Sequence, residues 1–244
     1  SAWFAERMAE FSGGDHAARF FVREVLGRRR QEFAQRANEF RLLALAEASG
    51  EDRIAPAYRR LETLFRVKVS SFERKRFENL SHEPNKAMNL NSYLGLMGGR
   101  FREQDTGDGL RLERVEVGPA DIEAPSADYV ITLDADSIIL PEYAGKLIRF
   151  AERPGNERYA VVQTPYSAFG GAPGACERVA GATTDIQYVV HQGFTSARAT
   201  YWVGANALLR RAALEEIATT ATERGHTVRV YIQDRTVIED TEST

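Results

Sequence analysis

From residue 129 onward the chain alternates short apolar stretches with longer helical ones, and this order leaves few folds open. Four stretches have strand character: YVITLD (129–134), YAVVQT (159–164), YWVGANALL (201–209) and TVRVYI (227–232). Three stretches between them have helical character: 141–152, 176–196 and 211–222. Strands that alternate with helices favour an α/β fold, with a mostly parallel sheet and helices on both of its faces.

The first part of the chain has a different pattern. Apolar residues of 2–48 recur at helical spacing, Gly13–Gly14 interrupt them, and a second helix is expected at 55–63. From residue 64 the pattern becomes strand-like in LFRVKVSSF (64–72) and in LERVEV (112–117). Between these two lie a helix, KAMNLNSYLGLM (86–97), and a polar loop (100–110). We therefore expect a helical segment at 1–63 and an α/β core at 64–244.

Composition excludes several classes of function. The formal net charge of −3 gives no general basic field, so nucleic acid is not an expected partner. Cys176 is the one cysteine, which excludes an internal disulfide framework. No apolar run of the sequence approaches the roughly 20 residues that a membrane-spanning helix needs.

Two aspartates follow the first of the four strands. Residues i and i+2 of a strand point to the same side, so Asp134 and Asp136 would aim together at the strand's carboxyl end. Neighbouring carboxylates repel each other, and a divalent cation with hard oxygen ligands, Mg²⁺ or Mn²⁺, relieves that repulsion. Asp-x-Asp after a strand therefore suits a clamp for a metal and a diphosphate. The alternative is that one aspartate only caps the next helix.

Five segments, in order, resemble motifs of the family 2 glycosyltransferases, in particular the processive branch around bacterial cellulose synthase. They are NKAMNLNSYL (85–94), DADS (134–137), VVQTPY (161–166), WVGANALLRRAALEEI (202–217) and VIEDTE (237–242). The resemblance implies a GT-A fold, which is Rossmann-like, and covers residues 64–244. Met88 and Ile238 stand where the family usually has glycine and threonine.

The resemblance assigns roles to particular residues. Asp134 and Asp136 would hold the metal, and Lys86 and Asn89 would lie near the donor nucleotide. Asp240, flanked by Glu239, would be the catalytic base. The sugar or acceptor would face two further groups of residues: Gln163, Thr164 and Pro165, and Trp202, Gly204 and Asn206. Several of these residues could instead have a purely structural role. Lys86 could be an exposed lysine, residues 163–165 a turn that ends a strand, Trp202 a core residue and Asp240 a surface acid.

The resemblance thus implies an inverting, metal-dependent transferase that moves a hexose from a UDP-linked nucleotide sugar to a glycan hydroxyl. It also implies that the native protein is anchored at the cytoplasmic face of the plasma membrane. The family's first nucleotide-binding strands and its Gln-x-x-Arg-Trp motif have no counterpart here, so we expect a piece of a transferase domain, inactive by itself if half the base pocket is missing. Two other hypotheses remain: a metal-dependent nucleotidyltransferase, and a non-catalytic interaction module on a transferase-like fold.

Overall fold

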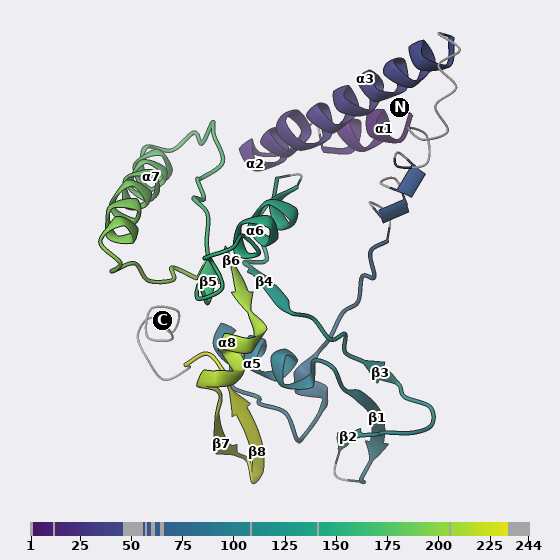
Figure 1. Cartoon of the computed structure of the whole chain (residues 1–244), viewed down its shortest axis with the longest axis vertical. Helices are drawn as coiled ribbons and strands as arrows, with labels where there is room; N and C mark the ends of the chain where they lie inside the picture. The colour runs from purple at the N-terminus through teal and green to yellow at the C-terminus, as the bar shows by residue number, and fades with distance from the viewer. Residues whose placement is uncertain are drawn as a thin grey trace. The chain divides into compact units, whose positions relative to one another are not determined.

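The computed structural model divides the chain into two compact units (Figure 1): residues 1–71 with 168–182, and residues 72–167 with 183–244. We describe each unit by itself. The structure describes residues 2–11, 13–45, 56, 58–59, 62–63, 66–107, 109–140, 142–204 and 206–233.

The N-terminal part of the first unit is helical. Its helices are α1 (Ala2–Phe11), α2 (His16–Phe20), the π-helical turn η1 (Phe21–Gly27) and α3 (Arg28–Leu45). Gly13–Gly14 separate α1 from α2. The Asp15 carboxylate caps α2 by accepting a hydrogen bond from the Ala18 amide at 2.9 Å. Edge-to-face contact between Phe11 and Phe21, with ring centroids 5.6 Å apart, fixes α1 against η1. Of the second helix expected at 55–63, residues 56, 58–59 and 62–63 are described and are helical, and the others lie outside the described residues.

A small sheet of three strands lies at the centre of the second unit. β6 (Asn206–Arg210) is the middle strand, between β4 (Tyr129–Leu133) and β5 (Val161–Val162). β6 is antiparallel to both neighbours, with Leu133 opposite Asn206 and Val162 opposite Leu208. Figure 1 shows the three strands side by side.

Each face of this sheet packs against a different helix, because successive residues of β6 point to opposite sides. Leu208 is buried with Leu147 and Ala151 of α6 (Tyr143–Ala151). On the other face, Ala207 and Leu209 are buried in a second cluster, which contains Leu94 of α5 (Lys86–Leu96) and Leu214 of α8 (Arg211–Ile217). Helices therefore cover both faces of the sheet.

A second sheet pairs β1 (Arg100–Asp105) with β2 (Leu110–Arg114) and β3 (Ile122–Glu123), after the short 3-10 helix η2 (Arg74–Arg76). The expectation of a polar loop at 100–110 was wrong for β1. Its sequence RFREQD shows no strand pattern, because Phe101 is its one buried side chain. The strand is held mainly by backbone pairing with β2. Phe101 packs in a cluster with Phe77 and Leu112.

The C-terminal described residues form a hairpin of β7 (Thr219–Glu223) and β8 (His226–Val230). Its two turn residues, Arg224 and Gly225, both have positive φ (51° and 80°), as a two-residue type I′ turn requires. The predicted helix 211–222 therefore ends at Ile217. The sequence TTATE that follows is rich in β-branched threonine, which favours a strand.

Two further expectations need correction. Every strand pair among the described residues is antiparallel, so the mostly parallel sheet expected from the order of strands and helices is not found. That order does not encode strand direction, and β6 runs opposite to β4 and β5. Of the strand predicted at 64–72, the described residues 66–72 have no strand partner, and Val67 and Val69 are exposed. Alternating residues form a half-buried strand only where a neighbouring strand exists.

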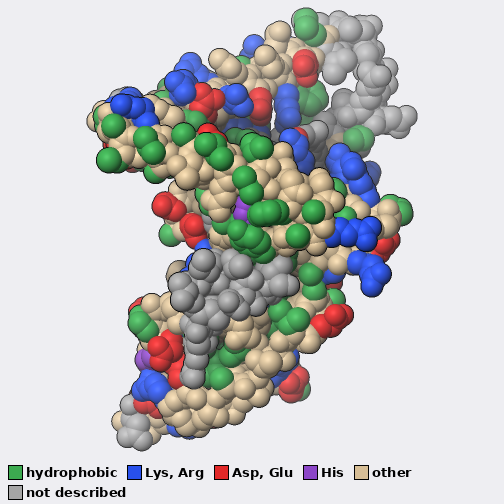
Figure 2. Space-filling view, turned by 90° about the vertical axis from the view of Figure 1, so that its left-hand side faces the viewer, with side chains coloured by type: hydrophobic (Ala, Val, Ile, Leu, Met, Phe, Trp, Pro, Cys, Tyr) green, Lys and Arg blue, Asp and Glu red, His purple; other side chains and the backbone are tan. Residues whose placement is uncertain are grey.

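The long helix α7 (Ala175–Ser196) has apolar side chains on its surface. Val179, Ile186 and Val189 are exposed, whereas His191 is buried. Figure 2 looks onto the side of the molecule where α7 lies and shows hydrophobic groups gathered there. Within the described ranges, no helix combines the length and the apolar character needed to cross a bilayer.

The amide of Asn91 joins α5 to the end of β8. Its Oδ1 accepts the backbone N–H groups of Tyr231 and Ile232 at 3.0 and 2.9 Å, and its Nδ2 donates to the Ile232 carbonyl at 2.7 Å. We predict that Asn91→Ala lowers the free energy of unfolding by about 3 kcal/mol, because buried backbone groups lose their partners. Urea denaturation measures this. Asn89→Ala, on the exposed side of the same helix, should change the free energy of unfolding by less than about 0.5 kcal/mol. Equal effects of the two substitutions would contradict the stabilising role of the Asn91 amide.

Glu215 of α8 lies between two arginines. Its Oε1 accepts from Arg211 Nε at 2.7 Å, and its Oε2 accepts from a terminal nitrogen of Arg229 at 2.7 Å. Burial alone would raise the pKa of Glu215, but the hydrogen bonds and charges of the two arginines outweigh burial and lower this pKa.

A carboxyl group whose pKa is lowered by folding stabilises the protein above its ordinary value of 4.5, and that stabilisation disappears as pH falls through the lowered pKa. We predict that Glu215→Gln lowers the free energy of unfolding at pH 7 by up to about 1 kcal/mol, and that the difference from wild type shrinks toward pH 3. Urea denaturation across this pH range tests it, with Glu216→Gln as the control. A difference independent of pH would contradict the assignment.

Candidate functional site

Lys86 is the centre of the candidate site. It is the first residue of α5, which begins here because the Asn85 side chain caps the helix by accepting the Met88 amide at 2.7 Å. The Lys86 ammonium donates to Asp134 Oδ1 at 2.5 Å and to the Gly204 carbonyl at 2.6 Å. One charged group therefore joins three of the five motif segments, although 48 and 118 residues separate Lys86 from its two partners.

Asp134 directly follows β4, and the chain turns there. The extended backbone ends at Leu133, and the Ser137 amide donates to the Asp134 carbonyl at 3.0 Å. Asp136 lies within this turn and is exposed. Strand alternation therefore does not fix the relative direction of the two carboxylates, contrary to the expectation that both continue the strand.

The segment after β5 joins the same region through Gln163. The Gln163 Oε1 accepts the backbone N–H of Val203 at 3.0 Å. The Thr164 carbonyl accepts a hydrogen bond from the hydroxyl of Tyr188 in α7, and Pro165 is exposed. Burial, and to a smaller extent the nearby Tyr166, raises the pKa of Tyr188, which keeps its hydroxyl protonated as a donor.

The loop before β6 supplies backbone and amide groups. Gly204 is buried with φ at +83°, a conformation that favours glycine, and it presents its carbonyl to Lys86. Asn206 lies opposite Leu133, at the end of the pair of strands that Asp134 follows. Its Oδ1 is buried and has no hydrogen-bond partner among the described residues.

Trp202 is buried and Asn89 is exposed. The Trp202 side chain is 3% exposed and belongs to the core cluster with Ala87 and Leu94, which matches the alternative of a core tryptophan. Asn89 is exposed on α5, while its neighbour Asn91 is the buried one. The predicted base Asp240 and its neighbour Glu239 lie outside the described residues.

Thr132 is a polar residue of this region that the sequence analysis did not single out. It is 3% exposed, and its hydroxyl has no hydrogen-bond partner within the described part of the chain. It precedes Asp134 by two positions in β4. A lone threonine in an apolar strand is ordinary in a sheet, so the sequence contains no signal that separates it from a structural residue.

The donor set of this region suits a hard divalent cation. Asp134 and Asp136 supply carboxylate oxygens, and the unpartnered Asn206 Oδ1 supplies an amide oxygen from the neighbouring strand. Within the described ranges, no group of three or more His, Cys, Asp and Glu side chains could hold a metal. Mg²⁺ needs only one or two carboxylates when water and phosphate complete its coordination, so the side-chain types present here are compatible with Mg²⁺ or Mn²⁺.

The pairing of Lys86 with Asp134 can be measured directly. Both side chains are partly exposed, at 32% and 40%, so solvent weakens their attraction. We predict a coupling energy of about 0.5–1 kcal/mol in a double-mutant cycle of Lys86→Met and Asp134→Asn, read from urea denaturation. The pair Lys86 and Asp136 is the control, and an equal coupling in both cycles would contradict a specific contact.

Residues 129–244 match the family described as Glycosyl transferase family group 2. This stretch contains Asp134, Gln163 and Gly204, but it does not include α5 or Lys86. No curated protein and no solved structure matches the chain. The second half of the chain is thus similar to a glycosyltransferase family, and the structure joins that half to Lys86 through two hydrogen bonds.

Proposed function

We propose that this chain is a metal-dependent, inverting glycosyltransferase that moves a hexose from a UDP-linked donor to a hydroxyl of a glycan. The observation that supports it best is the hydrogen bonding of Lys86 to Asp134 and Gly204, which brings together three segments resembling transferase motifs. The family match over residues 129–244 gives independent support for glycosyl transfer.

The donor's diphosphate would bind beside Lys86, Asp134 and Asp136. An ammonium group has three N–H donors. The contacts of Lys86 within the described residues use two of them, so one remains for a phosphate oxygen. Asp134 and Asp136 would hold Mg²⁺ or Mn²⁺, which supplies positive charge that stabilises a leaving diphosphate.

The acceptor would approach from the segments of Gln163 and Asn206. Asp240 would remove the proton from the acceptor hydroxyl as its oxygen attacks the anomeric carbon, and the bond from that carbon to the diphosphate oxygen would break. A single displacement of this kind inverts the configuration at the anomeric carbon. Asp240 ends as the protonated acid, and the electron pair leaves with the nucleoside diphosphate.

Anchoring at the cytoplasmic face of the plasma membrane is part of this proposal. It rests on the resemblance to the processive, cellulose-synthase-like branch, whose members extend a glycan at the membrane. Fractionation of cells that express the complete gene product would test it. Recovery of the protein from the cytosolic fraction alone would contradict the anchoring and leave the proposed chemistry unaffected.

The proposed base gives the sharpest test of the chemistry. We predict that Asp240→Asn lowers the rate of UDP release from a UDP-hexose by about 100-fold or more in the presence of Mn²⁺ and an oligosaccharide acceptor, because an amide cannot take the proton. Asp128→Asn is the matched control, since Asp128 is exposed and precedes β4, and its rate should equal that of the wild type.

The outcomes separate the competing functions. A nucleotidyltransferase has no use for the Asp240 carboxylate, so its activity would survive Asp240→Asn. An α-linked product from an α-linked donor, read from the anomeric proton by NMR, would rule out direct displacement. The third test measures UDP binding at increasing Mn²⁺ concentration. A non-catalytic module would bind UDP no better when Mn²⁺ is added.

A further inference from the structure

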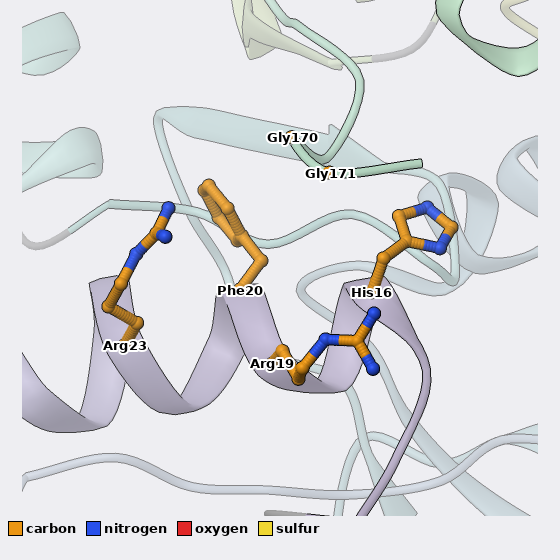
Figure 3. A pocket seen from close by; sticks show the side chains of 6 residues that line it. All are labelled: His16, Arg19, Phe20, Arg23, Gly170 and Gly171. Carbon is orange, nitrogen blue, oxygen red and sulfur yellow. The ribbon is translucent and has the colours of Figure 1, made fainter. Parts of the chain in front are cut away.

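The first unit contains a pocket of about 290 Å³ whose lining is basic. Its lining comes from α2, from η1 and from a loop distant in sequence: His16, Arg19, Phe20, Arg23, Gly170 and Gly171. All six residues belong to the same compact unit. Figure 3 shows Phe20 and Arg23 projecting from the helix toward the loop that carries the two glycines, with the Arg19 guanidinium on the His16 side.

The basic side chains share one face because of their spacing. Arg19 and Arg23 follow His16 by three and seven positions, which places all three along one stripe of a helix. None of the lining residues is acidic. Glu24, which pairs with Arg23 Nε at 2.6 Å, also lies 3.3 Å from Arg28, so one carboxylate serves two guanidinium groups and positive charge remains in excess.

Both arginines keep hydrogen-bond donors for a ligand. A guanidinium has five N–H donors. Within the described residues, Arg19 uses one of them on the Gly14 carbonyl at 3.0 Å, and Arg23 uses its Nε on Glu24. The remaining terminal N–H groups have the planar fork geometry that binds two oxygens of one phosphate.

The opposite wall of the pocket is backbone without side chains. Gly171 has φ at +89°, and a Cβ added at either glycine would meet no atom within 4 Å. This open space lets a ligand approach the backbone closely. Phe20 adds an apolar surface, and its ring is held in place by Phe169, with the two centroids 5.3 Å apart.

We propose that this pocket binds a small phosphate monoester, with the phosphate on Arg19 and Arg23 and a sugar or base ring against Phe20. Two guanidinium groups match the charge and the three terminal oxygens of a phosphate monoester better than they match a single carboxylate. The volume lies near the lower end of small-molecule sites, which suits one ring and its phosphate rather than a polymer. The site is independent of the transferase chemistry proposed above.

Isothermal titration of the whole chain with glucose 6-phosphate, in EDTA so that no metal site contributes, tests the proposal. We expect binding of glucose 6-phosphate, weaker binding of inorganic phosphate and none of glucose. Arg19→Gln with Arg23→Gln should weaken the binding of glucose 6-phosphate by about 100-fold, since each charge-assisted contact accounts for about tenfold or more. Arg30→Gln, an exposed change on α3 outside the pocket, should leave it unchanged.

A second variant keeps the test valid if the double arginine variant fails to fold, which circular dichroism would report. Gly170→Asp places a negative charge on the pocket wall, where its Cβ has open space, and it should abolish binding. Gly145→Asp on α6 makes the same change in open space at a glycine that does not line the pocket, and it should retain binding. Binding to phosphatidic acid vesicles but not to glucose 6-phosphate would support a phosphate monoester from a lipid. Equal binding by all variants, or no phosphate binding at all, would overturn the proposal.

Discussion

The hydrogen bonds of the Lys86 ammonium hold the candidate site together. Among the described residues, no backbone hydrogen bond joins α5 to the turn after β4 or to the loop before β6, so a side chain makes the connection. A charge-assisted bond to Asp134 is stronger than a neutral one, and the bond to Gly204 directs the ammonium between the two segments. Further along α5, Asn91 binds Tyr231 and Ile232, directly before the segment that contains Asp240. One helix thereby contacts the turn after β4, the loop before β6 and the end of β8.

The small sheet explains why α5 can serve this purpose. Ala207 and Leu209 of β6 bury their side chains against the α5 side, and Leu208 buries its side chain against α6. The sheet is therefore covered on both faces, and only its strand ends and the adjoining loops remain open to a ligand. Polar residues that follow the strands, such as Asp134 and Gln163, lie at these ends.

The sequence predicted those elements whose apolar residues reveal their burial. It placed α5, β4, α6 and β8 within a few residues, because their apolar residues recur at the spacing of a buried helix or strand. It also placed α7 from the spacing of its apolar residues, although Val179, Ile186 and Val189 are exposed. It missed β1, whose charged residues pair only through the backbone, and it could not supply strand direction, which depends on connections in space. In the site, motif order predicted the segments of Lys86, Asp134 and Gly204, but not their contacts. Whether Asn89 or Asn91 is buried depends on how α5 packs, and the basic pocket joins residues too far apart in sequence for any local pattern.

Hydrogen bonds hold the chain after β5 in place, whereas the loop that follows can change in length during evolution. Gln163 is bonded to Val203, Thr164 to Tyr188, and the Ser167 hydroxyl to the Asp185 carboxylate at 2.6 Å, so the segment is fixed as far as residue 167. The stretch from there to Ala175 contains two glycines with open surroundings. Insertions in such a loop are inexpensive, since doubling a loop's length adds only about 0.6 kcal/mol of closure entropy. Evolution can therefore reshape the rim of the basic pocket without disturbing the groups beside β5, and the two regions can acquire new specificities separately.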